Sequence, residues 1–487
     1  MYAAAPHIAS FELRNFYFVR QLVEDFSIPC DWHSTSGVHA FYSARLFAEV
    51  RRAVGRLVDN YPDLAANIEL VTKDEEDDSG ASKRAKGDGR GHSHCHSHSG
   101  GVPWLLDAER RETTLEGLRV GGAEGAVVQW KAASLWPYKL VAFVLERLLA
   151  DGQGRFNLQT TTPATGLTSS TSAGGATLWT VHTPRGTVTA PRVLLATNAY
   201  TSHLLPQFSD LVVPVRGQVS ALKPPPPPPP PSTSSSADRP HQQPPLDIGH
   251  TFYLAGEPDD PHSRDDYLIQ RPPPAAELVF GGGRKHARGR GVGVWDDGDI
   301  DEPVAWYLRG ELGELVDLSH RPALTSPSAA TAGAAGGDEM DEKKEEGSSS
   351  SSATTGTPAT TTKKQDLEPT YEWTGIMGFS RDGHPWVGEV PASLGGGPGL
   401  AVCAGYTGHG MPNAVLSAKA AVQLLMRSVP EGNSAAAGEE DEDEDEIDLP
   451  PEYLLTEDRV AAARLEDEVD VIDAKGSLFL EWGDMRV

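Results

Sequence analysis

The residues best placed to do chemistry are the glycines and the histidine of a loop that starts at Gly405. Leu400–Ala404 is an apolar run with the length of one buried strand. Gly405, Gly408 and Gly410 then favour a sharp turn, and the apolar spacing becomes helical from Asn413. A glycine loop before a helix N-terminus directs backbone N–H groups at one point. That arrangement suits a phosphate or a reduced flavin ring, although an ordinary buried turn explains the loop alone equally well.

The elements that must position this loop follow from the apolar periodicity. Helices are predicted at 8–26, 44–61, 137–149, 303–318 and 456–465, the last with Thr456 as its N-cap. Strands are predicted at 36–43, 156–162, 177–182, 193–196, 211–222, 251–254, 267–270 and 277–281, with a tight turn at 186–189. Helices and parallel-type strands concentrate near 131–207 and 371–428, and antiparallel signals lie between them. We therefore expect two discontinuous domains, one α/β and one α+β.

Composition narrows the classes of function. The chain has 487 residues and a formal charge of −27, which argues against nucleic-acid binding. No apolar run reaches the roughly 18 residues of a membrane span. Three cysteines give no disulfide framework and favour a reducing, cytoplasmic location. The acidic run 439–446 is typical of a solvated segment.

A histidine cluster lies in a low-complexity stretch near residue 95. Soft divalent metals could bind its side chains, which are His92, His94, Cys95, His96 and His98. A dedicated metal site normally has its ligands on a rigid frame, so incidental affinity is the favoured interpretation and no resident metal is expected.

With these features in place, the chain resembles the FAD-dependent oxidoreductases of the D-amino-acid oxidase, glycine oxidase and sarcosine oxidase superfamily, especially its fungal branch. Five stretches carry this resemblance, and they are 130–138, 192–206, 214–218, 371–388 and 405–413. The last two are the most specific to the family. The resemblance implies a discontinuous, Rossmann-like FAD-binding domain at 1–26, 131–207 and 371–430. It implies an antiparallel-sheet substrate domain at 27–72, 102–130, 208–223 and 246–324. Low-complexity insertions would occupy 73–101, 224–245, 325–365 and 431–449, before a C-terminal extension at 450–487.

The resemblance also implies which residues lie at the flavin. The free amides of Gly408, His409, Gly410 and Met411 would stabilise the ring edge that becomes anionic on reduction, and the Asp382–Pro385 turn would lie beside it. The cofactor-binding residues carried over are Ala164, Ala196, Thr197, Asn198, Asp382, Gly405, Gly408, His409, Gly410 and Met411.

Two features depart from the family pattern. The family opens with a βαβ unit carrying Gly-x-Gly-x-x-Gly for the FAD pyrophosphate, and this sequence has no such unit. A truncated sequence is the favoured explanation, and the alternative is a non-catalytic remnant that cannot hold FAD. The second departure concerns the basic residues that clamp a substrate carboxylate in relatives, because Met377 and Pro412 occupy their positions.

An unpaired buried carboxylate is costly, so an amine substrate is favoured over a free amino acid. Arg216, Arg284 or Arg381 could still supply a different clamp. The expected reaction is hydride transfer from a C–H beside a neutral amine to flavin, with oxygen as electron acceptor and the imine hydrolysed by water. The candidate catalytic residues are His409, Arg216 and Trp373, and an aromatic substrate wall would comprise Tyr253, Tyr267 and Trp373. Simple loop hydrogen bonding by His409 and core packing of the aromatic residues stay open as alternatives.

Overall fold

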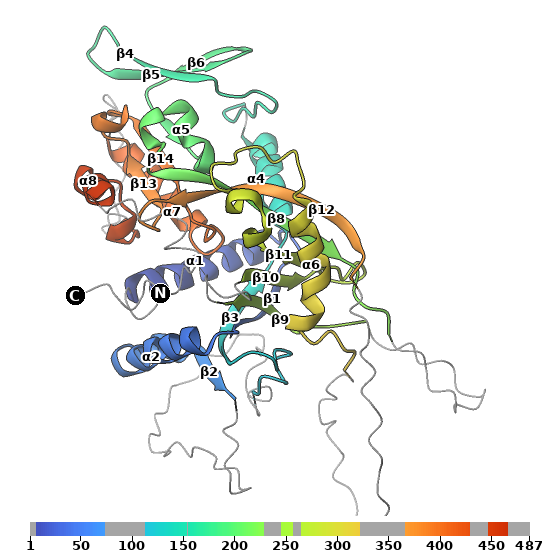
Figure 1. The fold of residues 1–487 in the computed structure, drawn as a ribbon. Coiled ribbons are helices and arrows are strands. Elements are labelled where there is room, and N and C mark those ends of the chain that lie inside the picture. The colour runs from blue at the N-terminus through green and yellow to red at the C-terminus, as the bar shows by residue number, and fades with distance from the viewer. Residues whose placement is uncertain are drawn as a thin grey trace, which may run out of the picture.

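The computed structural model describes residues 6–73, 113–152, 154–227, 245–256, 264–321, 366–428 and 447–465. The histidine cluster and most of the predicted low-complexity insertions lie outside these ranges. The described chain forms a large sheet below, a small sheet with helices above it, and a separate three-stranded sheet at the top (Figure 1). The predicted combination of α/β and α+β organisation is confirmed.

The large sheet has eight strands, and only β1 and β9 run parallel to each other. From one edge to the other the strands are β12 (Pro369–Ser380), β8 (Val212–Leu222), β11 (Leu278–Gly281), β10 (Asp265–Gln270), β9 (His250–Ala255), β1 (His33–Phe41), β3 (Gly125–Ser134) and β2 (Ile68–Thr72). The predicted antiparallel pairing of the three short strands β9, β10 and β11 is confirmed.

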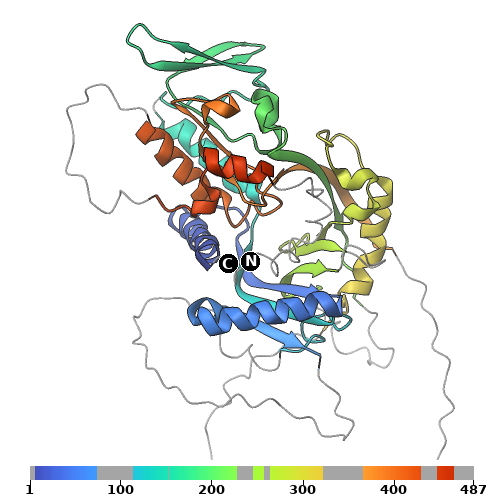
Figure 2. The ribbon, with the colours of Figure 1, turned by 60° about the vertical axis from the view of Figure 1, so that its left-hand side comes forward.

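One face of this sheet is covered by α6 (Glu302–Leu315), as Figures 1 and 2 show. Leu308 and Leu312 of α6 belong to the same core cluster as Phe252, Leu254 and Leu268, and all five are buried. Each such apolar side chain stabilises the fold by about 2 kcal/mol. Because side chains alternate along a strand, the residues between them face the opposite side of the sheet. At the β2 end, α2 (Ala44–Asn60) and α3 (Pro62–Ala65) complete this unit.

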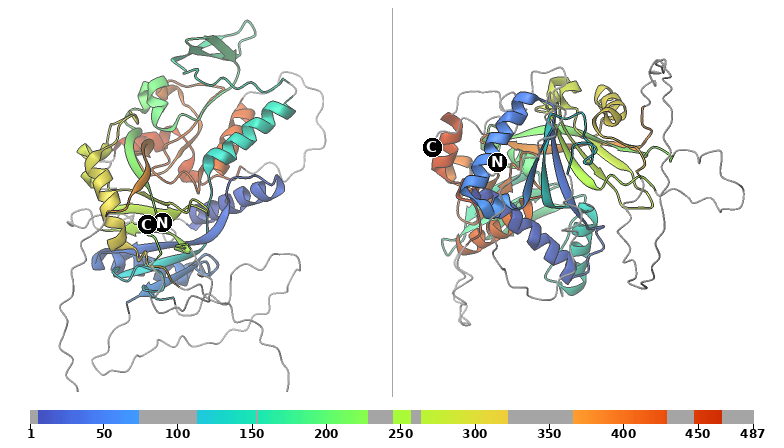
Figure 3. Two further views of the ribbon diagram at one scale, coloured as in Figure 1. Left: turned by 90° about the vertical axis from the view of Figure 1, so that its right-hand side faces the viewer. Right: turned by 90° about the horizontal axis from the view of Figure 1, so that it is seen from below.

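The small sheet has the order β13 (Trp386–Glu389), β14 (Leu400–Ala404) and β7 (Val193–Leu195), with β14 parallel to β7. Around it lie α4 (Pro137–Asp151), α5 (Thr201–Leu204), α7 (Ala414–Ser428) and α8 (Glu457–Leu465). Helix α1 (Pro6–Asp25) lies between the two sheets in Figures 1 and 3. Its Ile8 and Phe11 pack with Val387, Cys403 and Leu416, so α1 belongs to the small-sheet core.

The separate sheet consists of β4 (Gly166–Thr171), β5 (Thr177–Thr183) and β6 (Gly186–Ala190). The predicted turn at 186–189 is wrong, because these residues form β6. The alternating Thr187, Val188 and Thr189 favour a strand, and the turn falls at Pro184 and Arg185 instead. The strand predicted at 156–162 is also wrong, since within the described chain no neighbouring strand pairs with it.

Two segments lie in units other than those the sequence suggested. Strand β12, from the predicted FAD-binding domain, pairs along its length with β8 of the large sheet. Residues 450–465, predicted as an extension, place Leu455, Val460 and Ala463 in the core of the small-sheet unit. Among the described residues, no helix combines the length and apolarity that crossing a membrane requires.

Candidate functional site

The glycine loop (residues 405–413) is held where the two sheets meet. The Gly405 amide donates to Asn198 Oδ1 over 2.9 Å, and the Thr407 amide donates to the Gly378 carbonyl over 2.8 Å. The Thr407 hydroxyl in turn accepts from the Ser380 amide over 3.0 Å. A Cβ on Gly378 would lie 2.5 Å from Asn198 Oδ1, so the close approach requires glycine there. The loop is therefore fixed to the end of β7 and to β12.

The exposed part of the loop presents backbone amides. Gly408 has φ +79° and is exposed, and Met411 keeps 59% of its surface accessible. The amides of Gly408, Gly410 and Met411 make no hydrogen bond to another described residue. The His409 amide donates to the Tyr406 carbonyl over 2.7 Å, so the expectation that it is free is wrong. Three amides of the predicted four thus remain available to a ligand.

The N-terminus of α7 is capped by a distant helix. Asn15 of α1, which is 1% exposed, accepts from the Leu416 amide over 3.0 Å and donates to the Met411 carbonyl over 3.1 Å. Asn413 donates to the His409 carbonyl over 3.0 Å and accepts from the Tyr453 hydroxyl over 2.9 Å. The loop geometry is therefore set by contacts from both ends of the described chain.

A second histidine lies near the loop. Burial lowers the pKa of His39, on β1, to about 4, and the nearby His409 contributes, although a hydrogen bond with Gln129 opposes the shift. Burial likewise lowers the pKa of His409. Both rings are neutral at neutral pH and can accept a proton. The sequence analysis missed His39, yet its position between Val38 and Ala40, which face the core, places it on the opposite face of the sheet.

Two tyrosines share that face of the large sheet with His39. Tyr253 and Tyr267 are register partners on β9 and β10, and the His39 and Tyr253 rings lie 5.7 Å apart. Tyr267 lies over Gly281, where a Cβ would come within 2.5 Å of its ring. Trp373 is elsewhere, on the edge strand β12, 37% exposed with its ring 6.0 Å from that of Tyr371. The structure thus groups the two tyrosines and leaves Trp373 apart.

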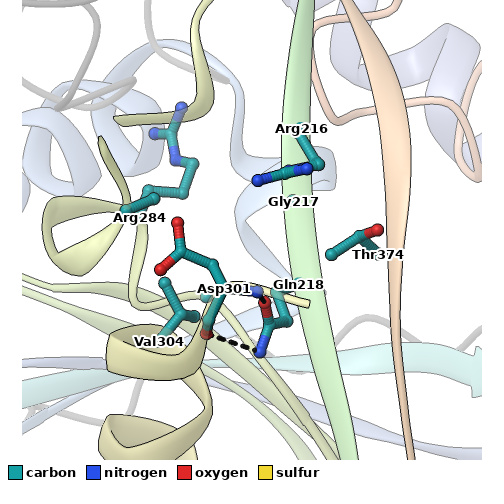
Figure 4. A pocket seen from close by; sticks show the side chains of 9 residues that line it. Arg216, Gly217, Gln218, Arg284, Asp301, Val304 and Thr374 are labelled. Atoms are coloured by element: carbon teal, nitrogen blue, oxygen red, sulfur yellow. Dashed lines mark hydrogen bonds between the residues drawn. The ribbon is translucent and has the colours of Figure 1, made fainter. Parts of the chain in front are cut away.

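The candidate basic groups have different surroundings. Arg216 lines a small hollow together with Asp301 and the stem of Arg284, where Gln218 binds the Asp301 backbone (Figure 4). Its Nη1 donates to the Asp296 carbonyl over 3.3 Å, and no described contact joins it to His409.

The other two arginines are engaged by protein groups. Arg284 Nε donates to Asp265 Oδ2 over 2.5 Å, and its Nη1 is buried without a hydrogen-bond partner among the described residues. Arg381 Nε donates to the Ala463 carbonyl of α8 over 2.7 Å. Arg381 is therefore part of the contact between β12 and α8, and it is not a free clamp.

The remaining predicted cofactor residues are spread over three elements. Ala196 and Thr197 follow β7, with the Thr197 hydroxyl 2.9 Å from that of Thr201, and Ala164 precedes β4. The carboxylate of Asp382 is bound by Arg459 over 2.8 Å and 3.0 Å. Burial raises the pKa of Asp382, but the bond and charge of Arg459 outweigh it, so the pKa stays below its usual value. This side chain is directed at α8, and the position of the turn 382–385 beside the cofactor stays a prediction.

The residues present fit the ring end of FAD. The amides of Gly408, Gly410 and Met411 are unoccupied by protein groups, and a Cβ on Gly408 would find only Met377 Sδ, at 3.9 Å. Such open amides stabilise a ring that gains negative charge. Within the described ranges, no cluster of three or more metal-ligating side chains occurs.

Comparisons with known proteins give a family and a fold. A family model described as "FAD dependent oxidoreductase" matches residues 2–424. The glycine oxidase structure from Geobacillus kaustophilus is 14% identical, with a TM-score of 0.52, and the match covers 88% of this chain and 81% of that one. The L-proline dehydrogenase structure from P. horikoshii is 13% identical with a TM-score of 0.48, covering 86% and 79%. A search of curated proteins finds no match. The family match carries the assignment, and the glycine oxidase likeness supports the fold alone.

Proposed function

The chain belongs to the FAD-dependent oxidoreductase family, and on that premise we propose that it oxidises the C–N bond of an amine. The family establishes the coarser part, a flavoenzyme that acts on amines or amino-acid-like substrates. The observation that carries the proposal is the set of open amides at Gly408, Gly410 and Met411. A Cβ added at Gly408 would have only Met377 Sδ within 4 Å, so the space directly beside this residue is open.

Bound FAD would supply the hydride acceptor. The protein's own part is to orient the amine in its neutral form, after an ammonium substrate has lost its proton to solvent. Burial lowers the pKa of both His39 and His409, so the two rings are neutral at neutral pH, add no positive charge beside the amine and can accept a hydrogen bond from its N–H. The substrate carbon loses a hydride, the nitrogen lone pair forms the C=N bond, and water then hydrolyses the imine to a carbonyl and a free amine. We include molecular oxygen as electron acceptor and a cytoplasmic location in the proposal.

An amine is favoured over an amino acid because of what surrounds the loop. Met377, where the family resemblance expects arginine, has its Cε 2.9 Å from where a Cβ on Gly217 would lie, and its Sδ is the closest atom to a Gly408 Cβ. A carboxylate placed against a thioether would lose its hydration without gaining a partner. Tyr253 and Tyr267 instead present aromatic faces, which attract cations.

A free amino acid is the second candidate, and Arg284 is the observation that favours it. Its Nη1 is a buried donor without a described partner, and a substrate carboxylate would satisfy it. Asp265 already neutralises this guanidinium, however, which weakens its hold on a second anion.

Anaerobic reduction of the flavin tests the proposal. Protein reconstituted with FAD is mixed with an amine or with the α-amino acid of the same side chain, and loss of the visible flavin absorption is followed. The proposal predicts faster bleaching by the amine. Met377→Arg should reverse the preference by about tenfold or more, because a charged hydrogen bond contributes roughly 1.5–3 kcal/mol. Met426→Arg on the exposed surface of α7 is the control and should leave the preference unchanged. Faster bleaching of the unmodified protein by amino acids would contradict the amine assignment.

A further inference from the structure

The C-terminal clasp (residues 447–465) follows the part of the chain that the family match covers, which ends at residue 424. It nevertheless packs onto the candidate cofactor site. The Leu455 amide donates to the Val387 carbonyl over 2.8 Å, which adds the clasp to the outer edge of β13. In Figure 2, α8 lies in front of the small-sheet unit, near α7. The clasp is therefore an integral layer of this unit.

Arg459 is the centre of the clasp. Its guanidinium binds both carboxylate oxygens of Asp382, and it also donates to the carbonyls of His384 and Pro385, each over 2.9 Å. The guanidinium lies 3.7 Å from the ring centroid of Trp386, which is fully buried. Arg459 thus contacts four of the five residues from 382 to 386, and its side chain is 12% exposed. A bidentate, stacked and buried arginine fixes geometry as well as charge.

A second contact reaches the glycine loop. Tyr453, which is 2% exposed, donates its hydroxyl to Asn413 Oδ1 over 2.9 Å. The same Asn413 side chain donates to the His409 carbonyl and to Glu12 Oε1 of α1. Tyr453 therefore helps to orient Asn413, a loop side chain that also contacts α1.

We propose that the clasp is a positioning element of the flavin site. Arg459 holds the turn 382–385 and Tyr453 holds the loop end at Asn413, before the cofactor binds. The claim that the clasp affects cofactor binding rests on the proposed function. The claim that Arg459 fixes the turn 382–385 concerns the protein alone. Neither residue needs to touch the reacting atoms. Preorganised donors stabilise developing charge without a reorganisation cost, so loosening either contact should weaken cofactor binding.

The test uses Arg459→Met with Arg464→Met as its matched control. Arg464 is on the same helix and forms a two-point ion pair with Asp210, over 2.8 Å and 3.0 Å, and among the described contacts it makes no hydrogen bond to residues 382–385. Amide hydrogen exchange of the cofactor-free protein and FAD affinity are measured for both. Arg459→Met should raise exchange across 382–388 and weaken FAD binding by about tenfold or more, and Arg464→Met should change either by no more than about twofold. Arg459→Lys, which keeps the charge, should recover part of both.

Three outcomes would count against the inference. Equal effects of Arg459→Met and Arg464→Met, or a rise in exchange spread evenly over both sheets, would reduce the clasp to a general stabiliser. Faster exchange at the turn with unchanged FAD affinity would remove its cofactor role. If Arg459→Met does not fold, Tyr453→Phe is the milder variant and should raise exchange in 405–416 alone. Failure of the unmodified protein to bind FAD would instead overturn the proposed function, and the exchange comparison would still decide whether the clasp holds the turn.

Discussion

His39 is the residue whose ionisation can be followed most simply. Its pKa in the folded protein is about 4, below the ordinary 6.5, because burial disfavours the charged ring. The unfolded chain therefore takes up the proton first as the pH falls. The stability linked to this group is complete above about pH 6.5 and is lost progressively down to about pH 4.

Replacing His39 by asparagine should flatten this part of the pH dependence. The folded protein should lose up to about 3 kcal/mol of unfolding free energy over that range because of His39, and the His39→Asn protein should lack this share. Urea unfolding at several pH values measures the difference between the two curves. His250, whose pKa burial also lowers to about 4, contributes equally to both curves. Parallel curves for the two proteins would contradict the buried, neutral assignment of His39.

Single residues also show where sequence reasoning stops. The glycine loop and its open amides were predictable, because Gly408 and Gly410 signal a turn before a helical pattern. The bond from the His409 amide to the Tyr406 carbonyl was not, since it depends on the loop's final dihedral angles. The proximity of His39 and His409 joins residues about 370 positions apart, which no local pattern records.

At the scale of elements, the cap of α7 is the clearest contact between segments that are far apart in the sequence. The sequence suggested a helix beginning near Asn413 with free amides, yet Asn15 of α1 accepts from the Leu416 amide. A helix N-terminus buried without such a partner would be costly. One amide at the N-terminus of α7 is therefore already bound by the protein. A ligand can bind instead to the free amides of the loop that precedes the helix.

Asn15→Ala should therefore destabilise the protein by about 1–2 kcal/mol, because it strips a cap and leaves the Met411 carbonyl unpaired as well. Thermal or urea unfolding measures the loss. Asn60→Ala is the control, since Asn60 is exposed and only its own helix accepts its bond, and it should stay within about 0.5 kcal/mol. Equal losses in the two variants would show that the interhelical cap contributes nothing.

The sequence predicts that helices α8 and α4 form, but it does not predict which elements pack against them. Helix α8 begins as expected, with the Arg459 amide donating to the Thr456 hydroxyl over 3.1 Å. Its packing on β13 could not be inferred, because the tract before it breaks the local pattern. Helix α4 carries Val141 and Leu148 on its apolar stripe, yet Val141 stays 54% exposed and Leu148 42% exposed. Periodicity gives the face of a helix but not what covers it.

At the scale of the whole molecule, the two-unit organisation was predictable from the order of parallel and antiparallel signals. The boundary was not, because β12 crosses from the turn at Asp382 into the large sheet and pairs with β8. That pairing places Gly378 under the loop and Met377 beside Gly408, so one strand serves both units. The sequence does not show that β12 contributes to both units. This dual role nevertheless decides which β12 residues lie beside the glycine loop.

The central claim is that the amides of the glycine loop hold a flavin, and FAD titration of the purified protein tests it most directly. The visible absorption and fluorescence of FAD are followed as protein is added, with circular dichroism confirming that the protein is folded. The account predicts saturable binding with a perturbed flavin spectrum, and bleaching of that spectrum when an amine is added without oxygen. A folded protein that leaves the FAD spectrum unchanged at every concentration would contradict it.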